Sequence, residues 1–358
     1  SKSYIVPNAY GNVLIIAPWN YPINLSLVPL VSAIAAGNTI VLKLSNSSIN
    51  TSKKIMDMIN NNFDECYIKA ILDEEHKILN ERFDYIFYTG SATAGKEVMK
   101  KASENLTPVT LELGGKSPCV VLKDADIKNA AKKIVFGKLL NAGQTCIAPD
   151  YVLVHKDVKD DLIKYMKEYI TLFLGKNPLE NDDYPKIINE KHFNRLLNLI
   201  KNEKIIFGGK SDKSSLKISP TILDKVKITS TIMKEEIFGP IFPIIEIDNH
   251  NEGILYIKSF EKPLALYLFT KDKKIQKEFM NEVSFGGGCI NNTIMHLTSH
   301  NLPFGGVGSS GMGSYHGKFG FDTFTHYKSI SKKGFIDLKI MYHKYDKKNL
   351  KLIKWFLK

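Results

Sequence analysis

The segment Tyr85-Ile-Phe-Tyr-Thr-Gly-Ser-Ala-Thr-Ala-Gly95 decides the fold class of this chain. Its apolar start, Tyr85–Tyr88, predicts a buried strand, and the Gly90-Ser91 pair predicts the turn from that strand into a helix. A further strand is predicted at Val109–Leu113, after the helix. Strand, helix and strand at these lengths are typical of a doubly wound parallel sheet.

The same alternation extends in both directions along the chain. Upstream, we predict strands at Asn12–Ala17 and Thr39–Leu42, and helices at Ile23–Ala36 and Ser47–Met58. Downstream, the predicted strands are Pro118–Leu122, Tyr151–His155, Thr221–Leu223, Ile241–Ile247, Ala265–Phe269 and Cys289–Asn291, and the predicted helices are Ile127–Leu140, Asp157–Leu174 and Asn189–Asn202. The glycine-rich stretch 303–313 is predicted to be a loop. The fold class is therefore α/β.

Length and composition set broad limits on the class of protein. A chain of 358 residues with 44% hydrophobic content can bury a large core divided over two or more domains. The chain has no run of 18 apolar residues and no apolar signal segment at its start, which predicts a cytoplasmic protein. The four cysteines form no CxxC pair and no zinc-type spacing with histidine, so free thiols are expected and no metal site is predicted.

The net charge of +12 raises the question of nucleic-acid binding. Arg82 and Arg195 are the only arginines, and all the other cationic side chains are lysines. Recognition of bases and phosphates favours the planar fork of arginine, whereas lysines interspersed with Asp and Glu are typical of solvated helix faces. The composition therefore argues against a nucleic-acid partner.

Two residues 34 positions apart carry the chemistry. Cys146 lies in Asn141-Ala-Gly-Gln-Thr-Cys-Ile-Ala-Pro149, where glycine and glutamine favour a bent loop, and Glu112 lies at the end of a predicted strand. A thiol can attack an aldehyde carbonyl, and a carboxylate can activate the water that hydrolyses the resulting thioester. A cofactor that accepts a hydride would complete the oxidation. The alternatives are a buried structural cysteine and a surface carboxylate.

The chain resembles the aldehyde dehydrogenase superfamily, and within it the class 3, fatty-aldehyde branch, over about residues 4–327. Five motifs occur in family order: Pro18-Trp-Asn-Tyr-Pro22, Leu111-Glu-Leu-Gly-Gly-Lys-Ser-Pro118, Gly143-Gln-Thr-Cys146, Glu235-Glu-Ile-Phe-Gly-Pro240 and Pro303-Phe-Gly-Gly-Val-Gly308. The class 3 likeness rests on the segments 144–151, 262–267 and 311–317. The resemblance implies oxidation of medium- or long-chain aliphatic or aromatic aldehydes by NAD or NADP.

The resemblance implies roles for three catalytic residues. Cys146 is the nucleophile, Glu112 activates water, and the side-chain amide of Asn20 stabilises the alkoxide together with the backbone N–H of Cys146. Without the resemblance, the position of Asn20 between two prolines is typical of a turn residue.

The resemblance also implies a cofactor site. Gly90 and Ser91 at a helix N-terminus, with Gly95 one turn later, would face the pyrophosphate. The remaining residues are assigned by motif: Lys43 to the adenine ribose, Glu236 to the nicotinamide ribose, and Phe238 and Trp19 to the pocket walls. Asn46 stands where the family commonly has glutamate, which removes a charge that would repel a 2′-phosphate, so we expect NADP to be tolerated.

The resemblance implies three parts: a cofactor domain at 1–114, a catalytic domain at 115–317, and an arm at 318–358 that supports a homodimer. Family members carry a helical segment before the position of Asn20, and this sequence, which lacks an initiator Met, is expected to lack part of it. Apolar side chains of the helix Ile23–Ala36 should then be exposed.

Two rival interpretations remain open. The last twenty residues, 339–358, are basic with interleaved apolar residues, and they form either a helix that docks on its own domain or one that binds a membrane surface. The first rival to the enzyme is therefore a non-catalytic scaffold that binds membranes through this tail. The second is a cysteine hydrolase, which would need a histidine next to Cys146.

Overall fold

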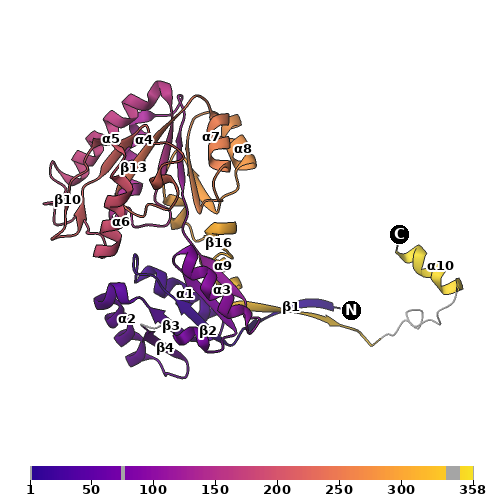
Figure 1. Cartoon of the computed structure of the whole chain (residues 1–358). Coiled ribbons are helices and arrows are strands. Elements are labelled where there is room, and N and C mark those ends of the chain that lie inside the picture. Colours follow the sequence, from indigo (N-terminus) through magenta and orange to yellow (C-terminus); the bar gives the residue numbers. More distant parts are fainter. Residues whose placement is uncertain (1, 74–76, 336–346, 358) are drawn as a thin grey trace. The chain divides into compact units, whose positions relative to one another are not determined.

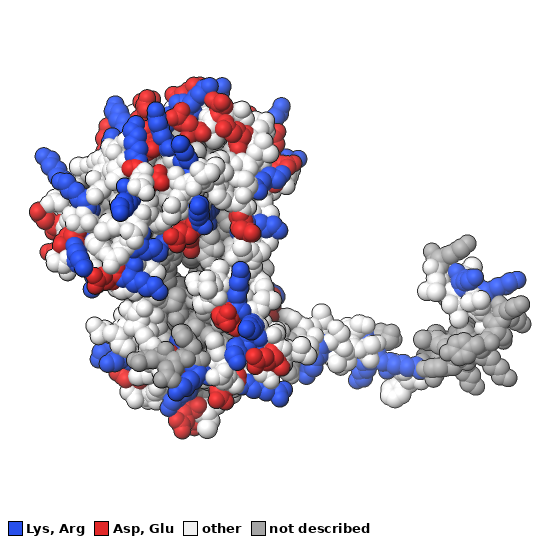
Figure 2. All heavy atoms as spheres, in the orientation of Figure 1, with Lys and Arg blue, Asp and Glu red and all other residues white. Residues whose placement is uncertain are grey.

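The computed structural model describes residues 2–73, 77–335 and 347–357. The chain forms two compact units: one spans Ala9–Thr325, and the other comprises the two ends, up to Asn8 and from His326. Figure 2 shows acidic and basic side chains interspersed on the visible face of the larger unit. The boundaries expected at residues 114 and 317 stay predictions.

The first sheet of the larger unit has six strands in the order β16-β6-β5-β2-β3-β4 (Figure 1). Five of them are parallel: β2 (Asn12–Ile16), β3 (Thr39–Leu44), β4 (Ile68–Leu72), β5 (Tyr85–Thr89) and β6 (Val109–Glu112). The helices α1 (Asn24–Ala35), α2 (Ile49–Asn62) and α3 (Ala92–Ser103) connect them. Val13 and Ile15 pack in one apolar cluster and Leu14 and Ile16 in another, so the central strand is buried on both faces.

The second sheet has seven strands in the order β15-β14-β7-β8-β13-β12-β9. Its parallel strands are β7 (Pro118–Val121), β8 (Tyr151–His155), β12 (Thr221–Asp224), β13 (Ile241–Ile247), β14 (Ala265–Phe269) and β15 (Gly287–Ile290), and β9 (Lys204–Phe207) pairs antiparallel at the edge. The helices of this region are α4 (Ile127–Leu139), α5 (Lys159–Leu174), α6 (Glu190–Ile200), α7 (His250–Lys258) and α8 (Lys273–Glu282). A short hairpin, β10 (Ser211–Asp212) and β11 (Lys217–Ile218), follows β9. The predicted doubly wound α/β architecture is confirmed.

We predicted that the glycine-rich stretch 303–313 is a loop, but the structure shows that it is not wholly one. It contains a 3₁₀ turn at Gly308–Ser310 and the short strand β16 (Gly311–Met312), which pairs antiparallel with β6. Gly311 lies opposite Glu112 and has a φ of +143°. A Cβ atom there would lie 2.2 Å from the carbonyl oxygen of Leu111, so only glycine allows this pairing. The stretch therefore closes one side of the first sheet at the strand that carries Glu112.

The helix α1 exposes two large apolar side chains, as expected. Ile23, at its N-terminus, is 59% exposed, and Val31 is 62% exposed. Helix α9 (Gly317–Thr323) packs against the same helix.

The smaller unit contains a two-stranded sheet of β1 (Lys2–Ala9) and β17 (Thr325–Lys332), followed by helix α10 (Lys347–Phe356). Most residues of both strands are exposed. Of the predicted basic tail, α10 is helical, whereas positions 339–346 lie outside the described residues. Among the described helices, none is long and apolar enough to cross a membrane.

Candidate active site

The segment that carries Cys146 is a tightly bent loop, as predicted. After α4, a 3₁₀ turn spans Leu140–Gly143, and Asn141, Ala142 and Gly143 all have positive φ angles, of 52°, 51° and 75°. A Cβ atom on Gly143 would lie 2.3 Å from the carbonyl oxygen of Gly239, so the close approach requires glycine. The loop thereby presents a partly exposed thiol at a fixed place.

Gln144 anchors this loop through its side chain. Its Nε2 donates to the carbonyl oxygens of Asn141 and Lys186, both at 3.1 Å, and its Oε1 accepts from the backbone N–H of Ile188 at 2.9 Å. Gln144 is buried. All three hydrogen-bond partners of this amide are backbone groups, so the Gln144 side chain is held in one conformation.

Asn20 reaches the Cys146 loop from the first sheet. Its Nδ2 donates to the carbonyl oxygen of Gln144 at 3.1 Å, and its own carbonyl accepts from Asn141 Nδ2 at 2.9 Å. The neighbouring Tyr21 hydroxyl lies 2.7 Å from Thr145 Oγ1. The structure therefore places the side-chain amide of Asn20 beside Gln144, two residues before Cys146. The amide nitrogen of Asn20 has a second N–H group in addition to the one that bonds to Gln144.

Glu112 ends β6 and is 3% exposed. Both of its carboxylate oxygens are buried and have no hydrogen-bond partner among the residues that the structure describes. Burial raises its pKa well above the ordinary value for glutamate. Thr89, opposite it in the sheet, also has a buried hydroxyl without a partner in the described part of the chain. A buried polar group without a hydrogen bond lowers the stability of the fold unless a ligand or water bonds to it, so Glu112 and Thr89 mark a candidate functional site.

The charges of Glu236 and Glu112 act on the Cys146 thiol. Burial, and to a smaller extent negative charge on Glu236 and on Glu112, raises the pKa of Cys146 to about 12. The backbone N–H groups of Cys146 and Ile147 act in the opposite direction. The thiol of Cys146 is therefore protonated at neutral pH in the protein without ligands. This protonation state was not predicted from the sequence.

Glu236 and Phe238 lie on the segment 234–240, which we call the Glu236 loop. A Cβ atom on Gly114 would lie 2.0 Å from Glu236 Oε2, and the backbone N–H of Gly115 bonds to this carboxylate. The glycine pair beside Glu112 therefore accommodates the Glu236 side chain. Burial and the charge of Asp150 raise the pKa of Glu236 to about 8.

An aromatic cluster lies on the other side of the Glu236 loop. Phe238 has a φ of +50°, and its ring meets Trp19 edge-on with 5.5 Å between ring centroids. His192 on α6 lies against the same indole, at 5.8 Å. The structure thus brings the rings of Trp19 and Phe238 into contact and adds His192, for which the sequence offered no signal.

The other expected cofactor residues lie at the carboxyl ends of the parallel strands. Lys43 ends β3 and is buried, which lowers its pKa, and the charge of Asp73 acts in the opposite direction. Asn46 follows in a 3₁₀ turn, and its buried Oδ1 has no partner among the described residues. Ligands of doubly wound sheets bind at this edge, so the position and the unpartnered oxygen fit a cofactor.

The turn between β5 and α3 contains the three remaining residues. The Ser91 hydroxyl accepts from the backbone N–H of Ala94 at 3.3 Å and caps α3. A Cβ atom on Gly90 would lie 2.2 Å from the Tyr88 hydroxyl, and one on Gly95 would lie 2.7 Å from Leu113. A side chain at either position would therefore have to displace Tyr88 or Leu113.

The histidines near the glycine-rich stretch belong to an aromatic stack. The His296 ring is nearly parallel to Phe304, and Phe304 in turn to His316. Burial lowers the pKa of His296 to about 4, and its Nδ1 lies 3.6 Å from Cys289 Sγ. In the described part of the chain, no histidine bonds to Cys146, and no group of three His, Cys, Asp or Glu residues could hold a metal.

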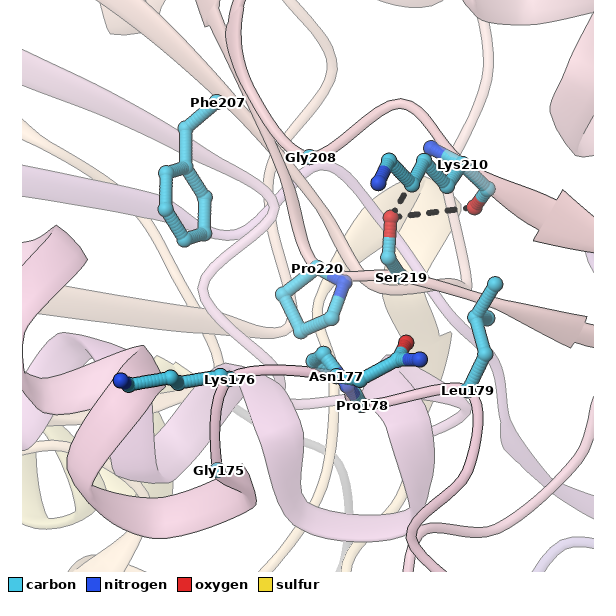
Figure 3. Close-up of a pocket in the computed structure, with 10 residues that line it drawn as sticks. All are labelled: Gly175, Lys176, Asn177, Pro178, Leu179, Phe207, Gly208, Lys210, Ser219 and Pro220. Carbon is cyan, nitrogen blue, oxygen red and sulfur yellow. Dashed lines mark hydrogen bonds between the residues drawn. The ribbon is translucent and has the colours of Figure 1, made fainter.

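A cavity of about 340 Å³ lies elsewhere in the second α/β region (Figure 3). The segment Gly175–Leu179 lines one side of it, and Phe207, Lys210 and Pro220 line the other. None of the expected site residues is in its wall. The cavity is therefore separate from the cluster around Cys146.

Residues 1–330 match the sequence model of the aldehyde dehydrogenase family. The chain belongs to this family. It is 52% identical to 4,4'-diaponeurosporen-aldehyde dehydrogenase of Staphylococcus aureus, over 92% of this chain and 73% of that protein. It is 46% identical to aldehyde dehydrogenase family 3 member A2 of Mus musculus, over 93% of this chain and 69% of that protein. These relatives confirm the likeness to the class 3 branch of the family.

A solved structure confirms the aldehyde dehydrogenase fold. The substrate-bound state of Staphylococcus aureus AldH matches with a TM-score of 0.96 and 49% sequence identity, over 99% of this chain and 79% of that one. The aldehyde dehydrogenase family oxidises aldehydes with NAD or NADP, and this chemistry applies to the chain as a member.

Proposed function

We propose that this chain oxidises long, apolar aldehydes to carboxylic acids through a thioester on Cys146. The buried, unpartnered carboxylate of Glu112 carries the proposal, because its charge acts on the Cys146 thiol and it has two free acceptor oxygens. A packed structural site would have satisfied those oxygens with protein donors. The Staphylococcus aureus relative is a 4,4'-diaponeurosporen-aldehyde dehydrogenase, which supports an aldehyde of that class as the substrate.

The proposed mechanism begins at the thiol. The Cys146 thiol releases its proton to solvent water and its sulfur bonds to the aldehyde carbon, which leaves a negative charge on the carbonyl oxygen. The second N–H group of the Asn20 amide and the backbone N–H of Cys146 stabilise that charge. A nicotinamide cofactor, when bound, would supply the hydride acceptor that oxidation of the thiohemiacetal to a thioester requires. The residues proposed to hold this cofactor are Lys43, Asn46, Gly90, Ser91, Gly95, Glu236, Phe238 and Trp19.

Glu112 acts in the second half of the proposed reaction. As a carboxylate it takes a proton from water, the water oxygen attacks the thioester, and the Cys146 sulfur leaves with the carboxylic acid released. Because burial raises the pKa of Glu112, the active carboxylate form becomes more abundant as the pH rises. We infer that hydrolysis of the thioester accelerates as the pH rises through the raised pKa of Glu112.

The test is formation of reduced nicotinamide, followed by its ultraviolet absorbance, with a long-chain aldehyde and NAD or NADP. We expect activity in the wild type and none in Cys146→Ser. Glu112→Gln should still form the thioester, in one rapid burst of about one equivalent, and then stall. A folded wild type that reduces neither cofactor would contradict the proposal.

A further inference from the structure

A buried ion pair joins the three segments of the proposed active site. Lys116 follows the Glu112 segment, and Asp150 ends the Cys146 loop. Lys116 Nζ lies 2.5 Å from Asp150 Oδ2, and the two side chains are 9% and 3% exposed. Asp150 also donates its backbone N–H to the carbonyl of Ser117 at 2.7 Å, which ties the two segments together twice.

The same ion pair also forms hydrogen bonds to the backbone of the Glu236 loop. Lys116 Nζ donates to the carbonyl oxygens of Ile232 and Glu235, both at 3.0 Å, so its three N–H groups have three acceptors. Asp150 Oδ1 accepts from the backbone N–H of Ile237 at 2.9 Å. The pair thus bonds to the main chain on both sides of Glu236.

Arg195 on α6 holds the loop from its other side. Its guanidinium donates to the carbonyl of Glu236 at 3.2 Å and to that of Ile237 at 2.6 Å. Phe238 comes next in the chain and has a positive φ angle, a conformation that non-glycine residues keep only when their surroundings impose it. The backbone around Glu236 and Phe238 is therefore fixed by side chains from three other segments.

We propose that Lys116 and Asp150 are a positioning pair, which couples the place of Glu236 and Phe238 to that of Cys146. Neither residue would touch the aldehyde or the cofactor; both would act through the Glu236 loop. Cofactor binding at Glu236 and the reactivity of the thiol would then be linked through one pair of charges. The inference rests on the proposed function.

The chain offers a matched control for loss of a buried ion pair. Lys159 and Asp224 lie 2.6 Å apart with side chains that are each 10% exposed, and Lys159 also contacts Glu246. This pair joins α5 to β12 and β13 and has no bond to the Cys146 or Glu236 loops. Lys159→Met should lower stability in the way that Lys116→Met does, without affecting the site.

The experiment compares Lys116→Met, Asp150→Asn, the double variant Lys116→Met/Asp150→Asn and Lys159→Met with the wild type. Three quantities are measured: the melting temperature, the Kd for NAD by calorimetry, and the rate at which iodoacetamide alkylates the Cys146 peptide with and without NAD. The double variant leaves no unpaired buried charge, so it should recover part of the lost melting temperature.

We expect the Kd for NAD to rise about tenfold or more in all three variants of the pair, because the Glu236 loop is no longer held. NAD should change the alkylation rate of Cys146 in the wild type and in Lys159→Met, and much less in the pair variants. The double variant should keep the weak NAD binding although it is more stable than either single variant.

Two other results would overturn the inference in distinguishable ways. If the pair variants bind NAD within about twofold of the wild type and Cys146 responds as before, the pair is structural only, while the proposed function stands. If the wild type binds neither NAD nor NADP, the proposed function fails first, and this inference with it.

Discussion

At the scale of single residues, the site is dominated by groups that hold their protons. Burial raises the pKa of Cys146 to about 12 and that of Glu236 to about 8, and it raises that of Glu112 well above its ordinary value. Burial therefore favours the protonated form of all three groups in the protein without ligands. The charges that the proposed chemistry needs must form when a ligand enters.

Glu112→Gln should stabilise the folded protein. A carboxyl whose folded-state pKa is raised binds more protons when folded than when unfolded, so wild-type stability falls as the pH rises from about 4.3 through the folded-state pKa. Glutamine does not titrate, and we expect a gain of about 1–3 kcal/mol at neutral pH. Melting temperatures of both proteins from about pH 5 to 9 measure the difference, which should grow with pH. A constant difference would contradict the raised pKa of Glu112.

Asn46→Glu should shift cofactor preference toward NAD. A carboxylate next to the adenine ribose would repel a 2′-phosphate, and the Asn46 amide does not. The measurement is the ratio of kcat/KM for NAD and NADP in both proteins, and we expect it to rise about tenfold or more in the variant. Asn46→Gln, which has the same length without the charge, is the control. An unchanged ratio would show that Asn46 does not face the ribose.

At the scale of elements, the apolar runs predicted most of the strands and helices within one or two residues. The elements that were not predicted are the strands β1, β4, β9, β10, β11 and β17 and the helices α7, α8 and α9. Helix α8 buries only Phe279 among its residues and is mostly polar, so few apolar side chains mark it in the sequence. The strand β16 exists because Gly311 allows close pairing with Leu111 and Glu112, which is a tertiary contact. No local pattern could have predicted it.

The candidate site shows the same division between local and tertiary signals. The glycines and positive φ angles of the Cys146 loop follow from its sequence, and the loop was predicted. In contrast, Gly114 leaves room for the Glu236 carboxylate, which lies more than a hundred residues away in the sequence, and His192 reaches Trp19 only through the packing of α6. The raised pKa of Cys146 likewise depends on burial by the whole domain.

Helix α10 should bind anionic membranes. Leu350, Ile353 and Leu357 recur at helical spacing and are exposed, and the exposed Lys351 and Lys354 lie beside them. A basic amphipathic helix inserts its apolar side chains between lipid tails while its lysines contact acidic headgroups. Co-sedimentation with vesicles that contain phosphatidylserine should therefore fall when residues 339–358 are deleted, and also in Lys351→Glu/Lys354→Glu. Equal sedimentation of all three proteins would contradict a membrane role for the tail.

At the scale of the whole molecule, the larger unit combines two doubly wound sheets whose loops meet around Cys146. Asn20 and Glu112 come from the first sheet, and Cys146 and Glu236 come from the second. Neither sheet alone holds the proposed chemistry. The smaller unit adds a two-stranded sheet, an arrangement that is marginally stable in water without a packing partner.

A second copy of the chain is the partner that we predict for this two-stranded sheet. Ile5 on β1 and Ile330 on β17 are both exposed, and burying them against another copy would stabilise a homodimer. Ile5→Lys/Ile330→Lys should therefore shift the sedimentation coefficient toward the monomer, and Leu255→Lys, an exposed apolar residue on α7, is the control. A wild type that sediments as a monomer at high concentration would contradict the prediction.

The protonated state of Cys146 bears on how the protein should respond to oxidants. Peroxides attack thiolates and spare thiols, and a catalytic cysteine that is permanently ionised is the residue that oxidative stress inactivates first. Here burial disfavours the thiolate of Cys146 in the protein without ligands, so we expect the sulfur to resist peroxide until an aldehyde arrives. On the proposed function, Cys146 would then be reactive in turnover and resistant at rest.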